Sequence, residues 1–151
     1  MTVTIRTATE SDLPDMVRLL SEDDFCNGRE DYRLPLPDCY TRAFAAVAAS
    51  PDVILLVAEN ELGVVGCLQV TFTPGISQRG ATRATLEAVM VDRRCQNQGI
   101  GAKLVQTAIT EARARHCRFV QLTSNKGRTG AHRFYEKLGF QKSHEGMKLA
   151  L

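Results

Sequence analysis

Apolar and polar residues alternate over several short stretches of the chain, and this period of two predicts β-strands with one buried face. Other stretches repeat their apolar residues every three or four positions, which predicts amphipathic helices. The predicted strands cover residues 3–8, 53–58, 64–73, 85–91, 119–123 and 140–151. The predicted helices cover residues 9–20, 40–49, 100–114 and 128–138.

The order of these elements predicts an α/β (α+β) fold with a mixed sheet. A turn at Asn60–Gly63 joins two predicted strands into an antiparallel hairpin. Three consecutive strands are then followed by the order strand, helix, strand, helix, strand. Because the chain has 151 residues and no internal repeat or low-complexity linker, we expect one domain over residues 1–151.

Composition and charge exclude several classes of protein. The net charge of +2 is too small to favour nucleic acid or an anionic membrane as a partner. No apolar run reaches the roughly 18 residues of a transmembrane helix. The N-terminus lacks the apolar core of a signal peptide. We therefore expect a cytoplasmic protein that contacts no membrane.

The five cysteines predict neither a zinc site nor a disulfide framework. Their number is odd, their spacing is wide and no Cys-x-x-Cys motif occurs. Cys67 and Cys117 lie in apolar runs and are expected in the core, whereas Cys95 lies in a polar loop and is expected to be exposed. No group of ligand-type residues indicates a metal site.

Residues 94–104 carry the strongest chemical signal, because a loop containing two glycines joins a predicted strand to the start of a predicted helix. Gly99 and Gly101 lack Cβ atoms, so a ligand can approach the main chain closely. The first helical turn offers unpaired N–H groups and the positive end of the helix dipole. Arg93, Arg94 and Lys103 add charge. The pattern favours a phosphate or pyrophosphate site, although a simple tight turn would also have this composition.

Two known phosphate-binding motifs do not fit this loop. A Walker A loop requires Gly-Lys-Ser/Thr, and a dinucleotide fingerprint requires a third glycine early in the chain. The pattern Gln96-x-x-Gly99-x-Gly101-Ala102 instead resembles the acetyl-CoA pyrophosphate loop of the GNAT superfamily of N-acetyltransferases. The segment 131–140, Ala-His-Arg-Phe-Tyr-Glu-Lys-Leu-Gly-Phe, is similar to the closing helix and strand of that family.

This resemblance covers essentially the whole chain and implies a central mixed, mostly antiparallel sheet flanked by helices, with acetyl-CoA as cosubstrate. It also implies a bulge in the strand before the loop, which the residues alone predict to be uninterrupted. The coenzyme-binding residues implied by the resemblance are Val89, Met90, Val91, Gln96, Asn97, Gln98, Gly99, Ile100, Gly101, Ala102, Asn125, Arg128 and Tyr135. Many family members have Asn where this chain has Arg128, so Asn125 is the alternative contact.

Three residues are candidates for proton transfer. The resemblance places Tyr135 near the coenzyme sulfur, where a phenol of pKa about 10 suits donation to the departing thiolate. Glu87 shares a strand face with Arg83 and is a candidate base, with an ion pair to Arg83 as the structural alternative. His144, in the last predicted strand, is a second candidate base or acceptor ligand, with a strand-surface histidine as the alternative.

The function implied is transfer of an acetyl group from acetyl-CoA to a primary amine of a small molecule by direct attack. The irregular segment 21–38 is either a solvated loop or, as in the family, one wall of the acceptor pocket. A weaker resemblance to aminoalkylphosphonate N-acetyltransferases would give Arg79 or Arg83 an anionic group to bind.

The alternatives are a protein lysine or N-terminal acetyltransferase and a non-catalytic acyl-CoA-binding regulatory module. Dimers are common in the family, so the resemblance also implies a homodimer.

Overall fold

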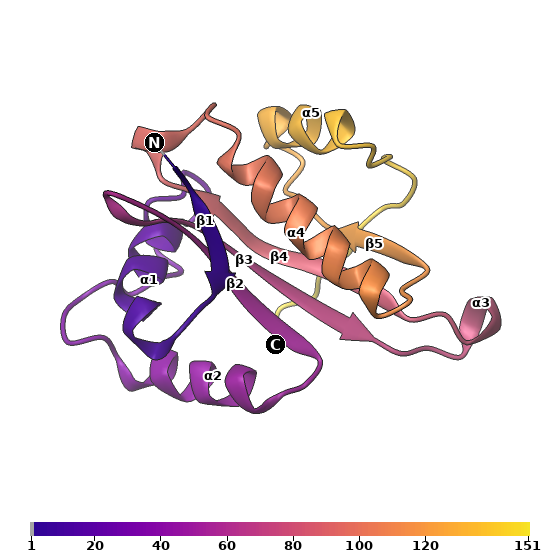
Figure 1. Ribbon diagram of the computed structural model, residues 1–151, viewed down its shortest axis with the longest axis horizontal. Coiled ribbons are helices and arrows are strands. Elements are labelled where there is room, and N and C mark those ends of the chain that lie inside the picture. The colour runs from indigo at the N-terminus through magenta and orange to yellow at the C-terminus, as the bar shows by residue number, and fades with distance from the viewer. Residues whose placement is uncertain (1) are drawn as a thin grey trace.

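The computed structural model describes residues 2–151 and has a sheet with helices on both faces (Figure 1). The strands are β1 (Thr4–Thr7), β2 (Val53–Asn60), β3 (Gly63–Thr73), β4 (Arg83–Val91) and β5 (Phe119–Leu122), and they lie in this order across the sheet. Strands β1 to β4 pair antiparallel, and β5 pairs parallel with β4. The predicted α/β (α+β) fold with a mixed, mostly antiparallel sheet is confirmed.

Four helices lie where the apolar spacing predicts them, with small shifts at their ends: α1 (Leu13–Ser21), α2 (Asp38–Ala49), α4 (Ile100–Ala114) and α5 (Thr129–Lys137). The short α3 (Ser77–Gly80) was not predicted, and short 3-10 turns lie at Glu10–Asp12 and Arg93–Cys95. The bounds of α4 are those that the sequence predicts. None of the helices within residues 2–151 is long and apolar enough to span a membrane.

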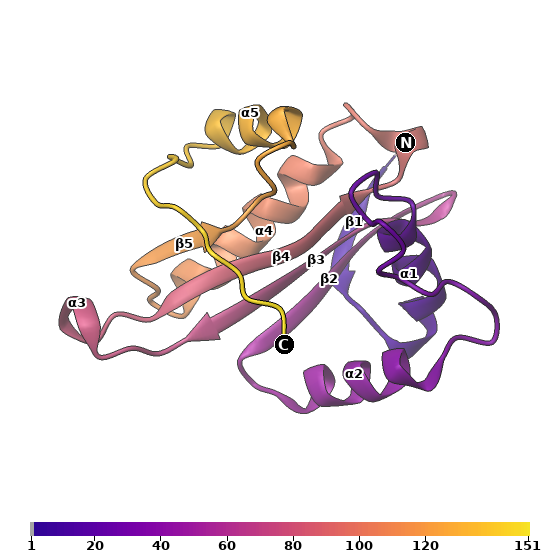
Figure 2. The ribbon, with the colours of Figure 1, turned by 180° about the vertical axis from the view of Figure 1, so that it is seen from behind.

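The sheet buries a hydrophobic cluster on each face. Leu104 and Val105 of α4 pack with Leu86 of β4 in the larger cluster. On the opposite face, Leu19 of α1 packs with Val57 of β2 in the smaller one. Helices α1 and α2 therefore cover one face, mainly at the β1–β3 side, and α4 covers the other (Figures 1 and 2).

The prediction of a last strand at residues 140–151 is wrong. After α5 the C-terminal tail, residues 141–151, is exposed along its whole length and forms no strand. It passes in front of β5 and β4 on the face opposite α4 (Figure 2). The physical reason is that no strand of this chain runs alongside the tail, so its alternating residues have no hydrogen-bond ladder to join.

Candidate active site

Strand β4 is irregular in its middle. Glu87 pairs with Gln69 of β3, whereas Met90, three residues further on, pairs with Cys67, only two residues back. Ala88 absorbs the extra residue with a φ of 51°, which a residue with a Cβ rarely adopts. The uninterrupted strand expected from alternation alone is therefore wrong, and the bulge implied by the family resemblance is present.

Just before the bulge, β4 also loses its second neighbour, β5. The pairing of β4 with β5 runs from Arg83 with Phe119 to Leu86 with Leu122 and stops there. The main chain of residues 87–91 therefore has backbone N–H and C=O groups without a strand partner on the β5 side. The divergence of the two strands places hydrogen-bonding groups in the middle of the molecule, where a ligand can use them.

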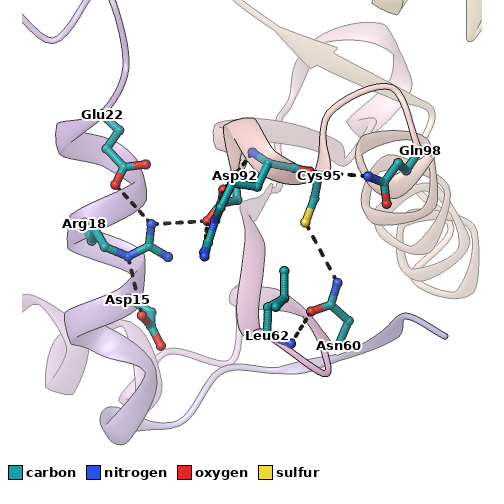
Figure 3. A network of polar contacts seen from close by, with 9 residues as sticks. Asp15, Arg18, Glu22, Asn60, Leu62, Asp92, Cys95 and Gln98 are labelled. Atoms are coloured by element: carbon teal, nitrogen blue, oxygen red, sulfur yellow. Dashed lines mark hydrogen bonds and ion pairs between the residues drawn. The ribbon is translucent and has the colours of Figure 1, made fainter. Parts of the chain in front are cut away.

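The loop after β4 is anchored by a buried carboxylate. Asp92 is only 2% exposed and accepts hydrogen bonds from Arg94 N at 2.9 Å, Arg94 Nη2 at 2.7 Å and Arg18 Nη1 at 3.2 Å (Figure 3). These bonds, mainly those from Arg94, hold the pKa of Asp92 well below its usual range. Because Arg18 belongs to α1, Asp92 fixes the start of the loop against another element.

The loop ends at Gly99, which caps α4 in the left-handed conformation with a φ of 79°. No atom lies within 4 Å of the position that a Cβ would take there, so the main chain is open to close approach. The first hydrogen bond within the helix runs from Lys103 N to Gly99 O at 3.0 Å, which leaves the preceding N–H groups available. Ile100 has a fully buried side chain, so it can offer a ligand only its backbone.

Gly101 has a packing role that the sequence does not suggest. A Cβ at Gly101 would lie 3.2 Å from Phe134 Cζ, so the missing side chain lets α5 pack closely on α4. Ala102 follows it in the first turn and is half-buried, whereas Gln96, Asn97 and Gln98 are exposed on the loop.

A pocket of about 230 Å³ lies beside the unpaired part of β4. Val89, Met90 and Val91 line it from the strand, and Gln96 lines it from the loop. The remaining wall is formed by Leu19 of α1, residues 22–25 after it, Arg93 and Arg128, which precedes α5. Five of the predicted coenzyme-binding residues therefore meet around one cavity.

Two arginines hold the segment 22–25 in place. Arg128 Nη1 donates to Asp23 Oδ1 at 2.8 Å, and its guanidinium carbon lies 4.4 Å from the centre of the Phe25 ring. Arg93 Nη2 donates to the carbonyl of Glu22 at 2.7 Å and pairs with Asp24. The beginning of the 21–38 segment is thus a fixed wall of the pocket rather than a free solvated loop.

These contacts change the expected roles of the arginines. Arg94 is bound to Asp92, Arg93 to the 22–25 segment and Arg128 to Asp23, so each already has an acidic partner. Arg128 also holds the pKa of Asp23 below its usual range. Of the three cations beside the loop, Lys103 is exposed in the first turn of α4 and is the one that makes no ion pair within residues 2–151.

Tyr135 lies in α5 within an aromatic cluster. Its ring makes edge-to-face contacts with Phe134 and Phe140, with ring centres 5.0 and 5.7 Å away. Burial raises the pKa of the Tyr135 hydroxyl, and the positive charge of Arg128 opposes this change. The hydroxyl therefore stays protonated at neutral pH and suits a proton donor.

Glu87 lies on a polar face of the sheet, which consists of Gln69, Thr71, Thr85, Glu87 and Gln121. Neighbouring Leu68 and Leu86 point the other way, into the α4 cluster. Glu87 is exposed, and its Oε2 accepts from Gln69 Nε2 at 3.5 Å, while Gln121 Nε2 donates to Thr85 Oγ1 at 3.1 Å. The expected alternative, an ion pair with Arg83, does not form within residues 2–151.

His144 occupies a position that differs from its expected one, whereas Asn125 lies just past β5 as expected. His144 lies in the exposed tail rather than in a strand, and its Nδ1 is 2.6 Å from the hydroxyl of its neighbour Ser143. Asn125 uses its Oδ1 to accept from Gly127 N at 2.8 Å, while its carbonyl lies 2.9 Å from His132 Nε2. Asn125 therefore shapes the turn before α5.

Sequence reasoning missed two features of this site and misplaced a third. Asp92 was not recognised, although an acidic residue between an apolar strand and two arginines was a usable signal. The pairing of Asp23 with Arg128 had no local signal. Cys95, expected to be exposed, is fully buried, with its Sγ 3.9 Å from Asn60 Nδ2 (Figure 3). No group of three or more metal-ligand side chains occurs within residues 2–151.

Known proteins share the sequence pattern and the fold described above. The sequence profile of the acetyltransferase (GNAT) family matches residues 13–140. The curated protein YdhI of Bacillus subtilis (strain 168), itself uncharacterised, is 29% identical over 85 residues. That alignment covers 56% of this chain and 48% of YdhI, so the chain spans about half the length of this curated relative.

Solved structures match over nearly the whole chain. A transcriptional regulator from Bacillus halodurans C-125 is 47% identical with a TM-score of 0.97, over 99% of this chain and 100% of that one. Glucosamine-6-phosphate N-acetyltransferase from Arabidopsis thaliana is 20% identical with a TM-score of 0.83, over 99% of both chains. AAC(6')-Iy, in complex with the bisubstrate analogue CoA-S-monomethyl-acetylneamine, is 13% identical with a TM-score of 0.82, over 100% and 99%. The last two similarities establish the fold alone.

Proposed function

Because the chain belongs to the GNAT family of acetyltransferases, we propose that it transfers an acetyl group from acetyl-CoA to the primary amine of a small polar molecule. The observation that carries this proposal is the divergence of β4 from β5 beyond Leu86, directly before a helix capped by Gly99. Val89, Met90 and Val91 of the unpaired strand line the pocket, and Gln96 lines it from the loop that leads to the open first turn of α4. Such a site can bind an extended ligand that ends in a pyrophosphate.

The residues present fit acetyl-CoA. The N–H groups of residues 96–102 bind the pyrophosphate, because Gly99 leaves the main chain open and α4 contributes its positive end. The unpaired backbone of Val89, Met90 and Val91 binds the pantetheine arm, as an added strand would. Lys103 supplies a full positive charge without having to break an ion pair.

Bound acetyl-CoA supplies the activated acyl group as a thioester. A backbone N–H of the unpaired β4 segment polarises the carbonyl that the amine attacks. Tyr135 donates a proton to the departing thiolate, and its raised pKa keeps that proton available. Glu87, exposed on the polar face, accepts the amine proton directly or through water. No residue of the pocket forms an acyl-enzyme in this route.

The polar face supports a small, hydroxylated amine as the acceptor. Gln69, Thr71, Thr85 and Gln121 offer hydroxyl and amide groups, and Glu87 is the acidic residue among them. The molecules in the names of two structural neighbours, glucosamine-6-phosphate and an aminoglycoside antibiotic, are amines rich in oxygen. An aminoalkylphosphonate is the variant of this proposal that would use Arg79 or Arg83, and a protein amine is the rival acceptor.

A non-catalytic regulatory module that binds acyl-CoA is the second candidate. The specific observation that favours it is the name of the 47% identical Bacillus halodurans protein, which is called a transcriptional regulator. This candidate retains the coenzyme pocket and assigns no acceptor to the polar face.

The experiment that separates these proposals measures thiol release from acetyl-CoA with amino sugars, aminoglycosides, aminoalkylphosphonates and a lysine peptide. We expect turnover on at least one small amine and a decrease in kcat of at least roughly tenfold in Tyr135→Phe. Calorimetry should show unchanged acetyl-CoA binding by the variant, which excludes a folding defect.

The other outcomes assign the site differently. Turnover that persists in Tyr135→Phe would remove Tyr135 as the acid. Tight acetyl-CoA binding without turnover on any acceptor would support the regulatory module.

A further inference from the structure

Cys67 of β3 has a buried thiol that contacts the main chain of β4 at the bulge. The residue is 1% exposed, and its Sγ donates a hydrogen bond to the carbonyl of Ala88 at 3.5 Å. The backbone N–H of Met90 makes a second hydrogen bond, to the same sulfur. The thiol therefore contacts the main chain on both sides of Val89.

The Cys67 thiol stays protonated over the whole range in which an enzyme of this kind works. Burial raises its pKa to about 12, although the hydrogen bond from the Met90 backbone opposes this change. A neutral thiol can donate one hydrogen bond and accept another, so it can hold the Ala88 carbonyl and the Met90 N–H together. It is also a poor nucleophile, which favours a structural use of this sulfur over a covalent one.

The two contacts fix the direction of the Val89 backbone. Both peptide bonds that flank Val89 are trans, and in a trans peptide the C=O and N–H groups point in opposite directions. Because the carbonyl of Ala88 points toward Cys67, the N–H of Val89 points away from it. Because the N–H of Met90 points toward Cys67, the carbonyl of Val89 points away as well. Val89 thus presents both groups on the side that β5 has left, where it lines the pocket.

The ladder with β3 does not hold this part of β4. The register passes from Glu87 opposite Gln69 to Met90 opposite Cys67, so Ala88 and Val89 have no residue opposite them in β3. Ala88 also has a φ of 51°, a strained conformation that persists only when its surroundings enforce it. The thiol supplies that enforcement from β3.

We propose that Cys67 is a positioning residue for acetyl transfer, and that it holds the Ala88–Val89 peptide so that the N–H of Val89 meets the thioester carbonyl. This inference rests on the proposed function. Cys67 acts through the backbone of Val89 and touches neither the coenzyme nor the acceptor. Its side chain lies instead among apolar residues of the α1 cluster, such as Leu19 and Val57.

Steady-state kinetics of Cys67→Ala, Cys67→Ser and Val64→Ala test the role in catalysis. Cys67→Ala should lower kcat at least roughly tenfold, because a misaligned N–H no longer stabilises the charge that develops on the carbonyl oxygen. The KM for acetyl-CoA should change less than kcat, since the pyrophosphate site is intact. Cys67→Ser retains a donor and an acceptor and should restore most of the lost kcat.

Val64→Ala is the matched control, because Val64 belongs to the same strand and the same cluster but does not contact the bulge. It should lower the melting temperature and leave kcat unchanged. A wild-type kcat in Cys67→Ala would overturn the proposal. A kcat in Cys67→Ser as low as in Cys67→Ala, or an equal loss in Val64→Ala, would overturn it as well.

Nuclear magnetic resonance tests the same geometry without turnover and, in its first step, without a variant. Acetyl-CoA should shift the Val89 amide proton of the wild type further downfield than CoA does, because only acetyl-CoA has the thioester carbonyl. This difference should be lost in Cys67→Ala and kept in Val64→Ala. No difference in the wild type, or the same difference in Cys67→Ala, would overturn the proposal. A difference that depends on Cys67 in a protein that acetylates no amine would remove the proposed function alone.

Discussion

Two regions of this protein each combine a buried aspartate, bound by an arginine, with a glycine of positive φ. Only one of the two regions leaves backbone N–H and C=O groups without a strand partner. At the β1–α1 corner, buried Asp12 is bound by Arg6, and the β2–β3 turn, which lies beside the other end of β1, has Gly63 with a φ of 96°. At the β4–α4 junction, buried Asp92 is bound by Arg94, and the loop ends at Gly99 with a φ of 79°.

The difference lies in the strands beside these devices. β1 and β2 are paired in register up to the corner, whereas β4 is bulged at Ala88 and has lost β5 beyond Leu86. The same buried carboxylate therefore stabilises a closed corner in one place and an open binding site in the other. Binding capacity comes from the unpaired main chain, and the carboxylate only holds it in position.

The largest contrast is expected between Asp92→Asn and Asp12→Asn. Each substitution weakens hydrogen bonds between a buried carboxylate and an arginine, so each should lower the free energy of unfolding by roughly 2 kcal/mol. Only Asp92→Asn should also raise the KM for acetyl-CoA, by at least roughly tenfold, because the loop loses its anchor to α1. Urea unfolding and steady-state kinetics measure the two effects. Equal KM values in both variants would show that the loop holds its shape without Asp92.

Acid titration tests the role of Asp12 by a second measurement. Arg6 lowers the pKa of Asp12 from 3.8 to about 2, so this carboxylate stabilises the fold above pH 3.8 and loses that contribution as the pH falls toward 2. The contribution is about 2 kcal/mol. Stability that decreases equally steeply over this interval in the wild type and in Asp12→Asn would contradict the assignment.

A smaller contrast is expected between Gly99→Ala and Gly63→Ala. Both glycines have positive φ and no atom within 4 Å of the added Cβ, so both variants should lose about 1 kcal/mol of stability from backbone strain alone. Gly99→Ala should in addition bind acetyl-CoA at least roughly tenfold more weakly, since its Cβ narrows the approach to the first N–H groups of α4. Calorimetric titration of both variants makes the comparison, and matching affinities would place the pyrophosphate elsewhere.

The smallest contrast is between Ala88→Gly and Ala84→Gly in β4, which should change the stability of the protein in opposite directions. Ala88 has a φ of 51°, so glycine should relieve strain and stabilise the protein by up to about 1 kcal/mol. Ala84 is fully buried in the regular half of β4, where glycine should destabilise by about 1 kcal/mol. Thermal unfolding compares them. A loss of stability in both variants would mean that the bulge carries no strain.

Much of the fold could be predicted because it depends on residues close together in the chain. The spacing of apolar residues predicted α4 with its observed ends, and the glycine at position 99 predicted the open turn before it. Alternation separated the buried face of β4, with Ala84 and Leu86, from the polar face with Thr85 and Glu87. These features require only the periodicity of a helix or strand.

Tertiary structure alone decided which residues form ion pairs and which strand residues lie opposite one another. Arg18 reaches Asp92 across 74 positions, and Arg128 reaches Asp23 across 105, so no local pattern records either contact. The bulge at Ala88 arises from the register with β3, and Cys95 is buried by elements distant in sequence.

The C-terminal tail shows most directly what the sequence determines and what the tertiary structure determines. By itself, the sequence determined a strand-like alternation at Met147 and Leu149, and that pattern is present. The tertiary structure decided that no strand of the same chain lies beside it, because a β-strand exists only through the hydrogen bonds that a neighbour supplies.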